Sequence, residues 1–260
     1  MKIVLFLLSF CLMLSCQTKK TISFNTLKHT ERKALFCYKN CQADSINCTY
    51  LRLSYPYFDK NNQELDSFLN HQIQQVLLQR PDSGQFISID AMRDSLFKEY
   101  EAFKKDIPDS ELPFTEEISI TVEGGKDSLL SLECLHYYYQ GGAHGSTVIK
   151  RRMFDLAKRE VLTPHHWIQL KNPDLLTLAA KAFRAYQEIP DSMSFTDAGY
   201  FWEADGYADG EFRLNDNFLI KNDSVMWLYN QYEIAAYAAG TPEVKLPLQQ
   251  VLPYLNKNGK

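Results

Sequence analysis

Apolar positions along the chain first follow a helical spacing and then an alternating one. Asn61 and Asn62 precede a run in which apolar residues recur every three or four positions, so a capped helix is expected there. A second helix follows the turn at residues 81–84 and ends at Pro108. The apolar stripes of these helices are Leu65, Phe68, Leu69, Ile73, Val76 and Leu77 in the first, and Met92, Leu96, Tyr100 and Phe103 in the second.

From Phe114 onward the period changes to two. Ile118, Ile120 and Val122 alternate with polar residues, residues 124–127 form a turn, and residues 130–138 alternate back, which predicts a hairpin. Other strands are expected at 48–57, 147–154, 161–162, 218–220, 225–229 and 244–246, and helices after Thr163, after Asn172 and from Leu248. Because most strands pair through hairpins, the expected fold class is α+β. We expect antiparallel sheets with packed helices, in two intimately associated α/β subdomains.

The first sixteen residues have the organisation of an export signal. Lys2 precedes an apolar run from Ile3 to Leu14, which is shorter than the roughly 20 residues that a membrane-spanning helix needs. Leu14-Ser15-Cys16 resembles a bacterial lipobox, so residues 1–15 are expected to be a cleaved signal and Cys16 a lipidated N-terminus. The polar residues 16–35 then form a tether, and Gln17 suggests the outer membrane of a Gram-negative cell. The alternative is plain secretion with Cys16 as a thiol.

Charge and composition exclude one class of partner. The chain has a net charge of −4, and removal of Lys2 with the signal leaves no basic excess for binding nucleic acid. Aromatic residues make up 13% of the sequence, which suits exposed sheets and contact surfaces.

Three cysteines, Cys37, Cys41 and Cys48, lie within twelve residues of one another. In an oxidising compartment this spacing predicts a disulfide between Cys48 and either Cys37 or Cys41. Zinc binding is the alternative, but no histidine nearby offers a fourth ligand. We expect no metal and no cofactor.

Residues 191–211 combine six acidic residues and five aromatic ones with no Lys or Arg. Aromatic anchors surrounded by one sign of charge suit a contact surface for a basic protein. The alternative is a loop that packs against the core. The candidate binding residues are Tyr200, Phe201, Trp202, Asp205, Tyr207 and Asp209.

A glycine-rich segment contains the most distinctive histidine of the chain. His144 follows a predicted strand and lies among Gly141, Gly142 and Gly145, where glycine permits close backbone approach and positive φ. One interpretation is a histidine exposed at a ligand groove. The other, which we favour, is a structural turn whose imidazole is hydrogen-bonded to backbone, because no nucleophile or carboxylate partner is evident from spacing.

Two stretches resemble the PdaC/RsiV-like envelope family. They are Tyr137 to Gly145 followed by Phe154-Asp155-Leu156, and Tyr232 to Gly240 followed by the strand at 244–247. The resemblance implies a PdaC-type N-terminal domain at 36–145 and an RsiV-type C-terminal domain at 146–256. It assigns a structural motif to Gly141, Gly142, His144, Gly145, Tyr232, Glu233 and Tyr237.

In that family these domains accompany a peptidoglycan deacetylase domain or form the lysozyme-binding part of an anti-sigma factor. The resemblance therefore implies a lipid-anchored, non-enzymatic binding module of the envelope that recognises a lysozyme-like protein or peptidoglycan. The alternative is a cell-wall hydrolase or deacetylase-associated enzyme that uses His144 and a carboxylate such as Glu233.

Overall fold

The larger of two β-sheets forms the long axis of the molecule. The computed structural model describes residues 22–43, 45–79, 87–202 and 211–256. The six strands, in spatial order, are β1 (Thr30–Cys37), β2 (Tyr50–Tyr57), β3 (Thr115–Lys126), β4 (Leu129–Tyr139), β5 (Ser146–Asp155) and β6 (Glu160–Leu162). Neighbouring strands are antiparallel except β2 and β3, which are parallel. A parallel pair needs a long crossover, which contains α1 (Gln63–Leu78) and α2 (Ile89–Asp106).

A smaller body follows in the C-terminal part of the chain. Its antiparallel sheet contains β7 (Phe218–Lys221), β8 (Ser224–Leu228) and β9 (Glu243–Pro247). Its helices are α3 (Pro164–Trp167), α4 (Pro173–Tyr186) and α5 (Leu248–Val251). Short 3-10 turns occupy Phe24–Thr26, Tyr38–Asn40, Tyr237–Ala239 and Leu252–Tyr254. The predicted α+β class is confirmed.

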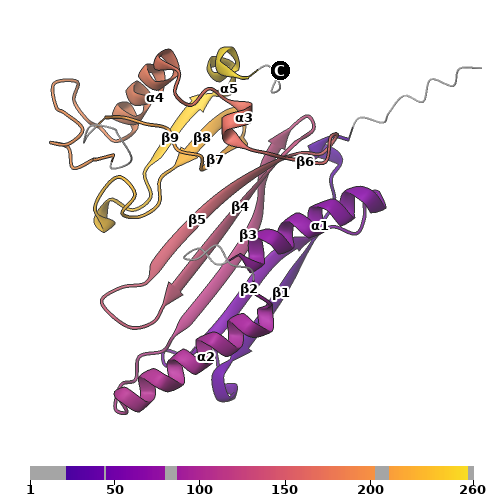
Figure 1. Ribbon diagram of the computed structural model, residues 1–260, viewed down its shortest axis with the longest axis vertical. Coiled ribbons are helices and arrows are strands. Elements are labelled where there is room, and N and C mark those ends of the chain that lie inside the picture. The colour runs from indigo at the N-terminus through magenta and orange to yellow at the C-terminus, as the bar shows by residue number, and fades with distance from the viewer. Residues whose placement is uncertain (1–21, 44, 80–86, 203–210, 257–260) are drawn as a thin grey trace, which may run out of the picture.

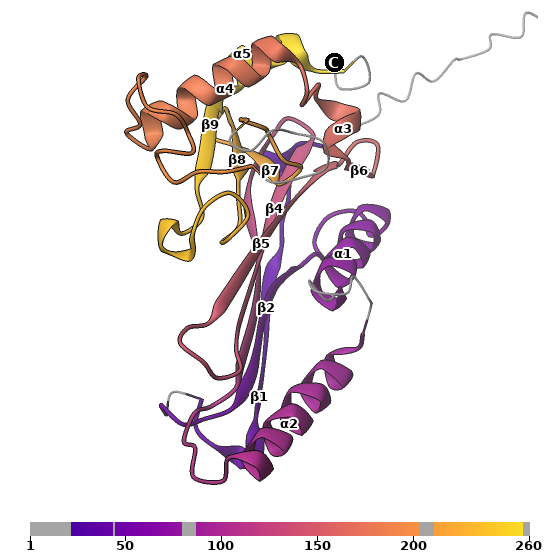
Figure 2. The same ribbon diagram turned by 60° about the vertical axis from the view of Figure 1, so that its left-hand side comes forward.

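The two bodies have separate hydrophobic cores on opposite faces of the large sheet. α1 and α2 cover one face, where Leu51, Leu53 and Ile118 are almost fully buried. The small body packs on the other face near its upper end, where Met153 of β5 joins the second core (Figures 1 and 2). Because side chains alternate along a strand, neighbouring residues of β4 and β5 contribute to different cores.

The ends of the helices match the capping residues of the sequence. Asn62 accepts a hydrogen bond from Leu65 N at 2.8 Å and begins α1. Asn172 accepts from the first turn of α4, whose first residue is proline. Each of these side chains satisfies a backbone N–H that the helix leaves unpaired.

The predicted tether at residues 16–35 extends too far. Residues 30–37 form β1, and Ile22, Phe24 and Leu27 pack against the first core. Basic side chains such as Arg32 and Lys33 made this segment look like a linker, but these two lie on an edge strand whose backbone pairs with β2. Cys16 and the predicted signal lie outside the described residues.

The expected division between residues 145 and 146 falls inside the large sheet. It separates β4 from β5, which pair along their whole lengths. The family resemblance placed the division at the glycine turn, whereas the backbone leaves this sheet only after β6. The chain passes to the second core at Trp167.

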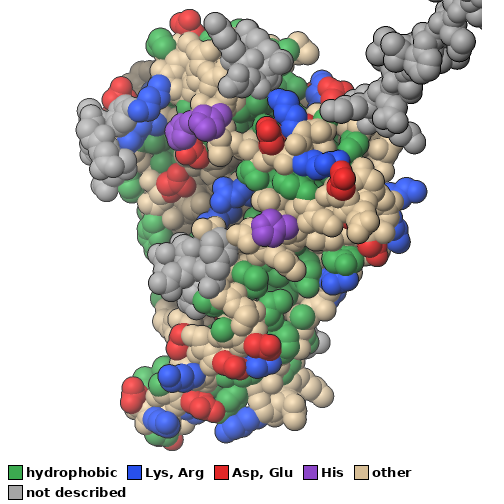
Figure 3. All heavy atoms as spheres, turned by 45° about the vertical axis from the view of Figure 1, so that its right-hand side comes forward, with side chains coloured by type: hydrophobic (Ala, Val, Ile, Leu, Met, Phe, Trp, Pro, Cys, Tyr) green, Lys and Arg blue, Asp and Glu red, His purple; other side chains and the backbone are tan. Residues whose placement is uncertain are grey.

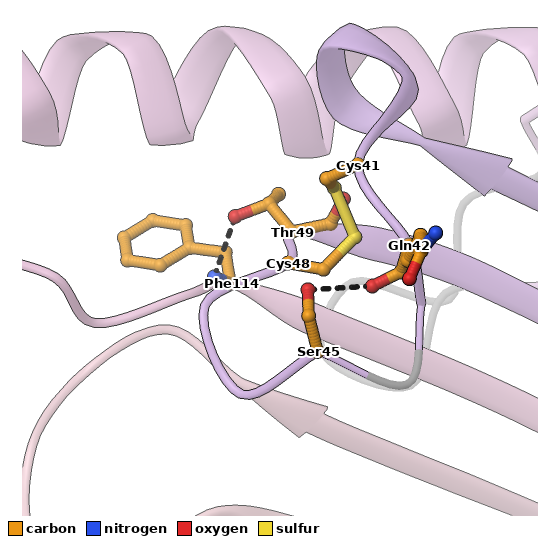
Figure 4. Close-up of a disulfide and its surroundings, with 6 residues drawn as sticks. All are labelled: Cys41, Gln42, Ser45, Cys48, Thr49 and Phe114. Atoms are coloured by element: carbon orange, nitrogen blue, oxygen red, sulfur yellow. Dashed lines mark hydrogen bonds between the residues drawn. A yellow bond between two sulfur atoms is a disulfide. The ribbon is translucent and has the colours of Figure 1, made fainter.

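The disulfide joins Cys41 and Cys48, one of the two pairings that the spacing predicted. It closes a short loop beside the start of β2 (Figure 4). Within this loop Ser45 Oγ donates to Gln42 O at 2.7 Å. Next to the bridge, Thr49 Oγ1 accepts from Phe114 N at 3.0 Å and links β2 to the segment before β3. Cys37 has a free thiol.

None of the helices in the described part of the chain has the length and apolar character needed to cross a bilayer.

Candidate functional site

The glycine turn after β4 positions His144 at the junction of the two bodies. Gly141 and Gly142 both have positive φ, which lets the chain reverse between β4 and β5. His144 is exposed, and its ring stacks on Tyr237 with centroids 3.8 Å apart and planes at 20°. Tyr237 belongs to the segment after β8, so this stack joins the large sheet to the small body.

The contacts of His144 fix its tautomer. Nδ1 lies 2.9 Å from Gly145 O, and because a carbonyl oxygen only accepts, Nδ1 carries the proton. Nε2 of the neutral ring is then an acceptor, and the hydroxyl of Tyr232 lies 3.5 Å from it. We call His144, Tyr232 and Tyr237 the junction ledge.

Gly145 is required by close packing. A Cβ atom at this position would lie 2.4 Å from the ring of Tyr137, closer than non-bonded atoms approach. The Tyr237 hydroxyl donates to Gly145 O at 3.2 Å. The backbone of Gly145 therefore connects the ring of Tyr137 with the ledge.

Glu233 does not form an acid–base pair with His144. Its Oε1 accepts from Asn215 Nδ2 and its Oε2 accepts from Asn230 N, both at 2.7 Å. The carboxylate thus closes the turn after β8. In the described part of the chain, His144 contacts Gly145, Tyr232 and Tyr237, and none of these residues carries a carboxylate.

Part of the predicted acidic–aromatic surface is core. Trp202 is only 3% exposed, and its ring lies 5.2 Å from the rings of Phe195 and Phe212. Tyr200 packs against the same core, and its hydroxyl donates to Gln187. Aromatic rings gather around α4 because their burial stabilises a small body, so the alternative of ordinary packing holds for these two residues.

Of the other residues of the predicted surface, the structure describes only Phe201. Phe201 is half-buried and bonds through its N–H to Ile234 O at 2.8 Å. Asp205, Tyr207 and Asp209 lie outside the described residues.

Two asparagines that the sequence analysis did not single out protect the edge of β5. Asn230 Oδ1 accepts from Ile149 N and Asn217 Oδ1 accepts from Arg151 N, both at 2.7 Å. Both amide groups also donate to Ile149 O. The two side chains satisfy backbone N–H and C=O groups at this edge, as a paired strand would. The available signal was the presence of asparagines directly beside the predicted strands at 218–220 and 225–229.

A buried arginine adds an ionic link between the bodies. Arg151 is 6% exposed, and its guanidinium donates to Glu133 at 2.9 Å and to Glu243 at 2.5 Å. It also donates to Met226 O at 3.1 Å. Since Glu133 lies on β4 and Glu243 on β9, one side chain ties the two sheets together.

The surface offers no metal site within the described ranges, where no group of three or more His, Cys, Asp or Glu residues is arranged to hold an ion. His136 and Glu116 form a buried pair at 2.7 Å on the helix-covered face. On the face drawn in Figure 3, acidic and basic side chains are interspersed, and neither sign gathers into a broad patch.

Comparisons with known proteins match two parts of the chain to separate families. Residues 42–147 match the family model described as deacetylase PdaC, and residues 169–249 match DUF3298, a family described as proteins of unknown function. No curated protein matches the chain.

Two solved structures share the fold. A DUF3298 family member from Bacteroides fragilis aligns with a TM-score of 0.67 at 19% identity, covering 90% of this chain and 96% of that chain. A DUF3298 family protein from Pseudomonas aeruginosa gives 0.64 at 18% identity, covering 89% and 95%. The chain thus joins a PdaC-type region to a DUF3298 region, the two-part arrangement of the PdaC/RsiV-like envelope proteins that its motifs resemble.

Proposed function

We propose that this protein is a non-enzymatic binding module of the bacterial envelope and that it binds its partner through the junction ledge. The observation that carries the proposal is the conformation of Tyr232. The residue is 60% exposed and its φ is +65°, in the left-handed region that a bulky residue seldom adopts. An exposed ring held at an energetic cost is typical of functional positions.

The ledge has the composition of a contact surface. Tyr232 lies 5.6 Å from Tyr237, and Tyr237 stacks on His144, so three rings form one continuous group. Tyrosine supplies a large amphipathic contact area at low entropic cost. The enzymatic alternative lacks support, because Glu233 is engaged by Asn215 and Asn230 and His144 has a backbone carbonyl as its Nδ1 partner.

The partner is a peptidoglycan strand or a lysozyme-like protein. To test this, the full chain in detergent is mixed with isolated cell-wall sacculi and, separately, with lysozyme, and binding is measured by co-sedimentation and calorimetry. Tyr232→Ala should weaken binding to one of them by about tenfold, as expected for a central aromatic contact.

Tyr186→Ala is the matched control. Tyr186 is 66% exposed at the end of α4, so this variant removes an equally accessible ring away from the ledge. If the full chain binds neither probe, or if both variants weaken binding equally, the proposal is wrong.

The same proposal includes an anchor at Cys16. Cys16→Ser should abolish incorporation of radiolabelled palmitate and release the protein from the outer-membrane fraction, because stable attachment needs more than one acyl chain. Cys37→Ser, which changes a free thiol of β1, should leave labelling intact. Retention of label in Cys16→Ser would exclude the anchor.

A further inference from the structure

The lower part of the large sheet has a second, largely polar face that no described element covers. α1 and α2 lie on one side of the sheet, and the small body covers the upper end of the other side and reaches the β4–β5 turn through Tyr237 (Figure 2). The strand register pairs Arg52 with Glu117 and Glu117 with Tyr137, so these three side chains share the uncovered face. Tyr50 joins them two residues before Arg52. We call Tyr50, Arg52, Glu117 and Tyr137 the sheet platform.

Hydrogen bonds connect three of the four platform residues, Tyr50, Arg52 and Glu117. Tyr50 donates its hydroxyl to Glu117 Oε1 at 2.5 Å, and Arg52 Nη1 donates to the same oxygen at 3.0 Å. The guanidinium of Arg52 also lies over the ring of Tyr50, 4.9 Å from its centroid. Burial, followed by the bond to Glu117, raises the pKa of Tyr50 to about 12, so its ring is uncharged at physiological pH.

The platform is continuous with the junction ledge. The ring of Tyr137 packs against Gly145, whose carbonyl accepts from Tyr237. Aromatic rings therefore follow one another from β2 across β4 to the small body. By strand spacing, the Cα atoms of Tyr50 and Tyr137 lie about 12 Å apart.

The charges on this face cancel in pairs. Arg52 bonds to Glu117, and Lys33 lies 2.9 Å from Glu31, which also accepts from the hydroxyl of Ser54. A surface that attracts a charged protein presents an excess of one sign, and this face does not. Its charge pattern is complementary to an uncharged, polar partner.

Sugar rings have the chemistry that this pattern fits. Their C–H faces stack on aromatic rings, and their hydroxyl groups bond to planar guanidinium and carboxylate groups. We infer that an uncharged glycan strand lies across the sheet platform and reaches the junction ledge. This inference rests on the proposed function, because it assigns a ligand class to the surface that contains the ledge.

Calorimetry with soluble chitin oligosaccharides and the full chain in detergent tests the inference. Tyr50→Ala and Tyr137→Ala should each weaken binding by about tenfold, because each removes one stacking ring. Tyr137→Phe, which keeps the ring, should bind nearly as well as the natural chain, and Tyr186→Ala should bind equally. Circular dichroism of each variant shows whether it is folded.

Ser119→Arg is a second, independent variant. Ser119 is half-buried in the middle of the same face of β3. A long side chain at this position should obstruct a glycan strand that lies across the sheet, and it removes none of the hydrogen bonds of the platform. Weak binding by this folded variant supports the inference even if Tyr137→Ala fails to fold.

Three results would overturn the glycan assignment. They are no binding of the oligosaccharide, equal binding by the folded platform variants, and loss of lysozyme binding in those variants with the oligosaccharide unaffected. The proposed function is judged separately by Tyr232→Ala with sacculi and lysozyme, so it survives if that variant alone loses binding.

Discussion

At the scale of single residues, the junction ledge combines exposure with backbone strain. For an L-residue the left-handed region costs roughly 1–2 kcal/mol, and Tyr232 occupies it although the residue is 60% exposed to solvent. Little burial offsets this cost. Substitution of Tyr232 by glycine should therefore change the stability of the fold and the affinity for the ligand in opposite directions.

Tyr232→Gly should raise the free energy of unfolding by up to about 1 kcal/mol while weakening ligand binding, because glycine adopts positive φ without strain. Urea unfolding measures the first effect. Tyr186→Gly, in the last position of α4, should instead lower stability by about 0.5–1 kcal/mol. A Tyr232→Gly protein less stable than the natural chain would show that the tyrosine side chain contributes more than its conformation costs.

The sequence identified which residues form a distinctive motif more readily than it predicted what each residue does. The motif containing His144, Tyr232 and Tyr237 was recognisable because glycines and aromatics recur there in a fixed order. Trp202 was assigned to a surface because its neighbours in sequence are acidic, but its neighbours in space are Phe195 and Phe212. Local composition cannot report contacts that form only when distant segments pack.

At the scale of elements, the loop before β2 is closed by the Cys41–Cys48 disulfide, with a sequence separation of seven. A bridge across so short a loop stabilises by about 2.5 kcal/mol in the chain-entropy treatment. Replacing Cys41 and Cys48 by serine and alanine should lower the free energy of unfolding in urea by this amount. Cys37→Ser should have little effect. If the Cys41/Cys48 double variant and Cys37→Ser lose the same amount of stability, the cause is packing of the cysteine side chains and not the disulfide.

An ion pair between Glu123 of β3 and Lys221 of β7 joins the two sheets and should make stability depend on pH. Burial raises the pKa of the Glu123 carboxyl, but hydrogen bonds from Lys221 at 2.6 Å and Thr121 at 2.7 Å outweigh burial and leave the pKa below 4.5. A lowered folded-state pKa stabilises the fold above about pH 4.5, and this contribution is lost as pH falls through the folded value. Nearby Arg151 acts in the same direction.

Glu123→Gln should therefore flatten the acid side of the stability–pH curve and lower stability at neutral pH. Chemical unfolding at a series of pH values below neutrality measures this. Glu64→Gln, at a carboxylate whose side chain is 74% exposed, is the control and should follow the natural chain. If both variants keep the natural acid dependence, the pair with Lys221 does not contribute to it.

Long periodic elements were predicted well and β1 was not. α1 and α2 have apolar stripes and capping residues within their own sequence, so their signal is local. β1 has three charged residues in a row and only part of an apolar pattern, and its pairing with β2 decides its structure. An edge strand with charged side chains is hard to distinguish from a linker by composition alone.

At the scale of the whole molecule, the two bodies share an interface that contains polar contacts as well as the buried Met153. Asn217 and Asn230 satisfy the edge of β5, and Ser131 Oγ donates to Ile220 O at 2.9 Å. Arg151 connects β4, β5 and β9 through two carboxylates. The sequence predicted two associated subdomains, but this interface was not visible in it because its members lie far apart along the chain.

These contacts should make the two bodies unfold together. Trp167, Trp202 and Trp227 all belong to the second core, so tryptophan fluorescence reports on the small body and far-ultraviolet circular dichroism on both. The two signals should change at the same urea concentration in the natural chain, as they do in a two-state transition. Arg151→Met leaves Glu133 and Glu243 unpaired at the interface, and we expect a loss of about 3 kcal/mol.

In Arg151→Met the fluorescence transition should therefore precede the circular dichroism transition, because the small body loses its attachment while the first core keeps its own packing. Arg159→Met removes a solvent-exposed pair with Glu64 and should cost less than about 1 kcal/mol with the transitions still coincident. Coincident transitions in Arg151→Met would mean that burial of Met153 and its apolar neighbours, rather than the ionic link, couples the two bodies.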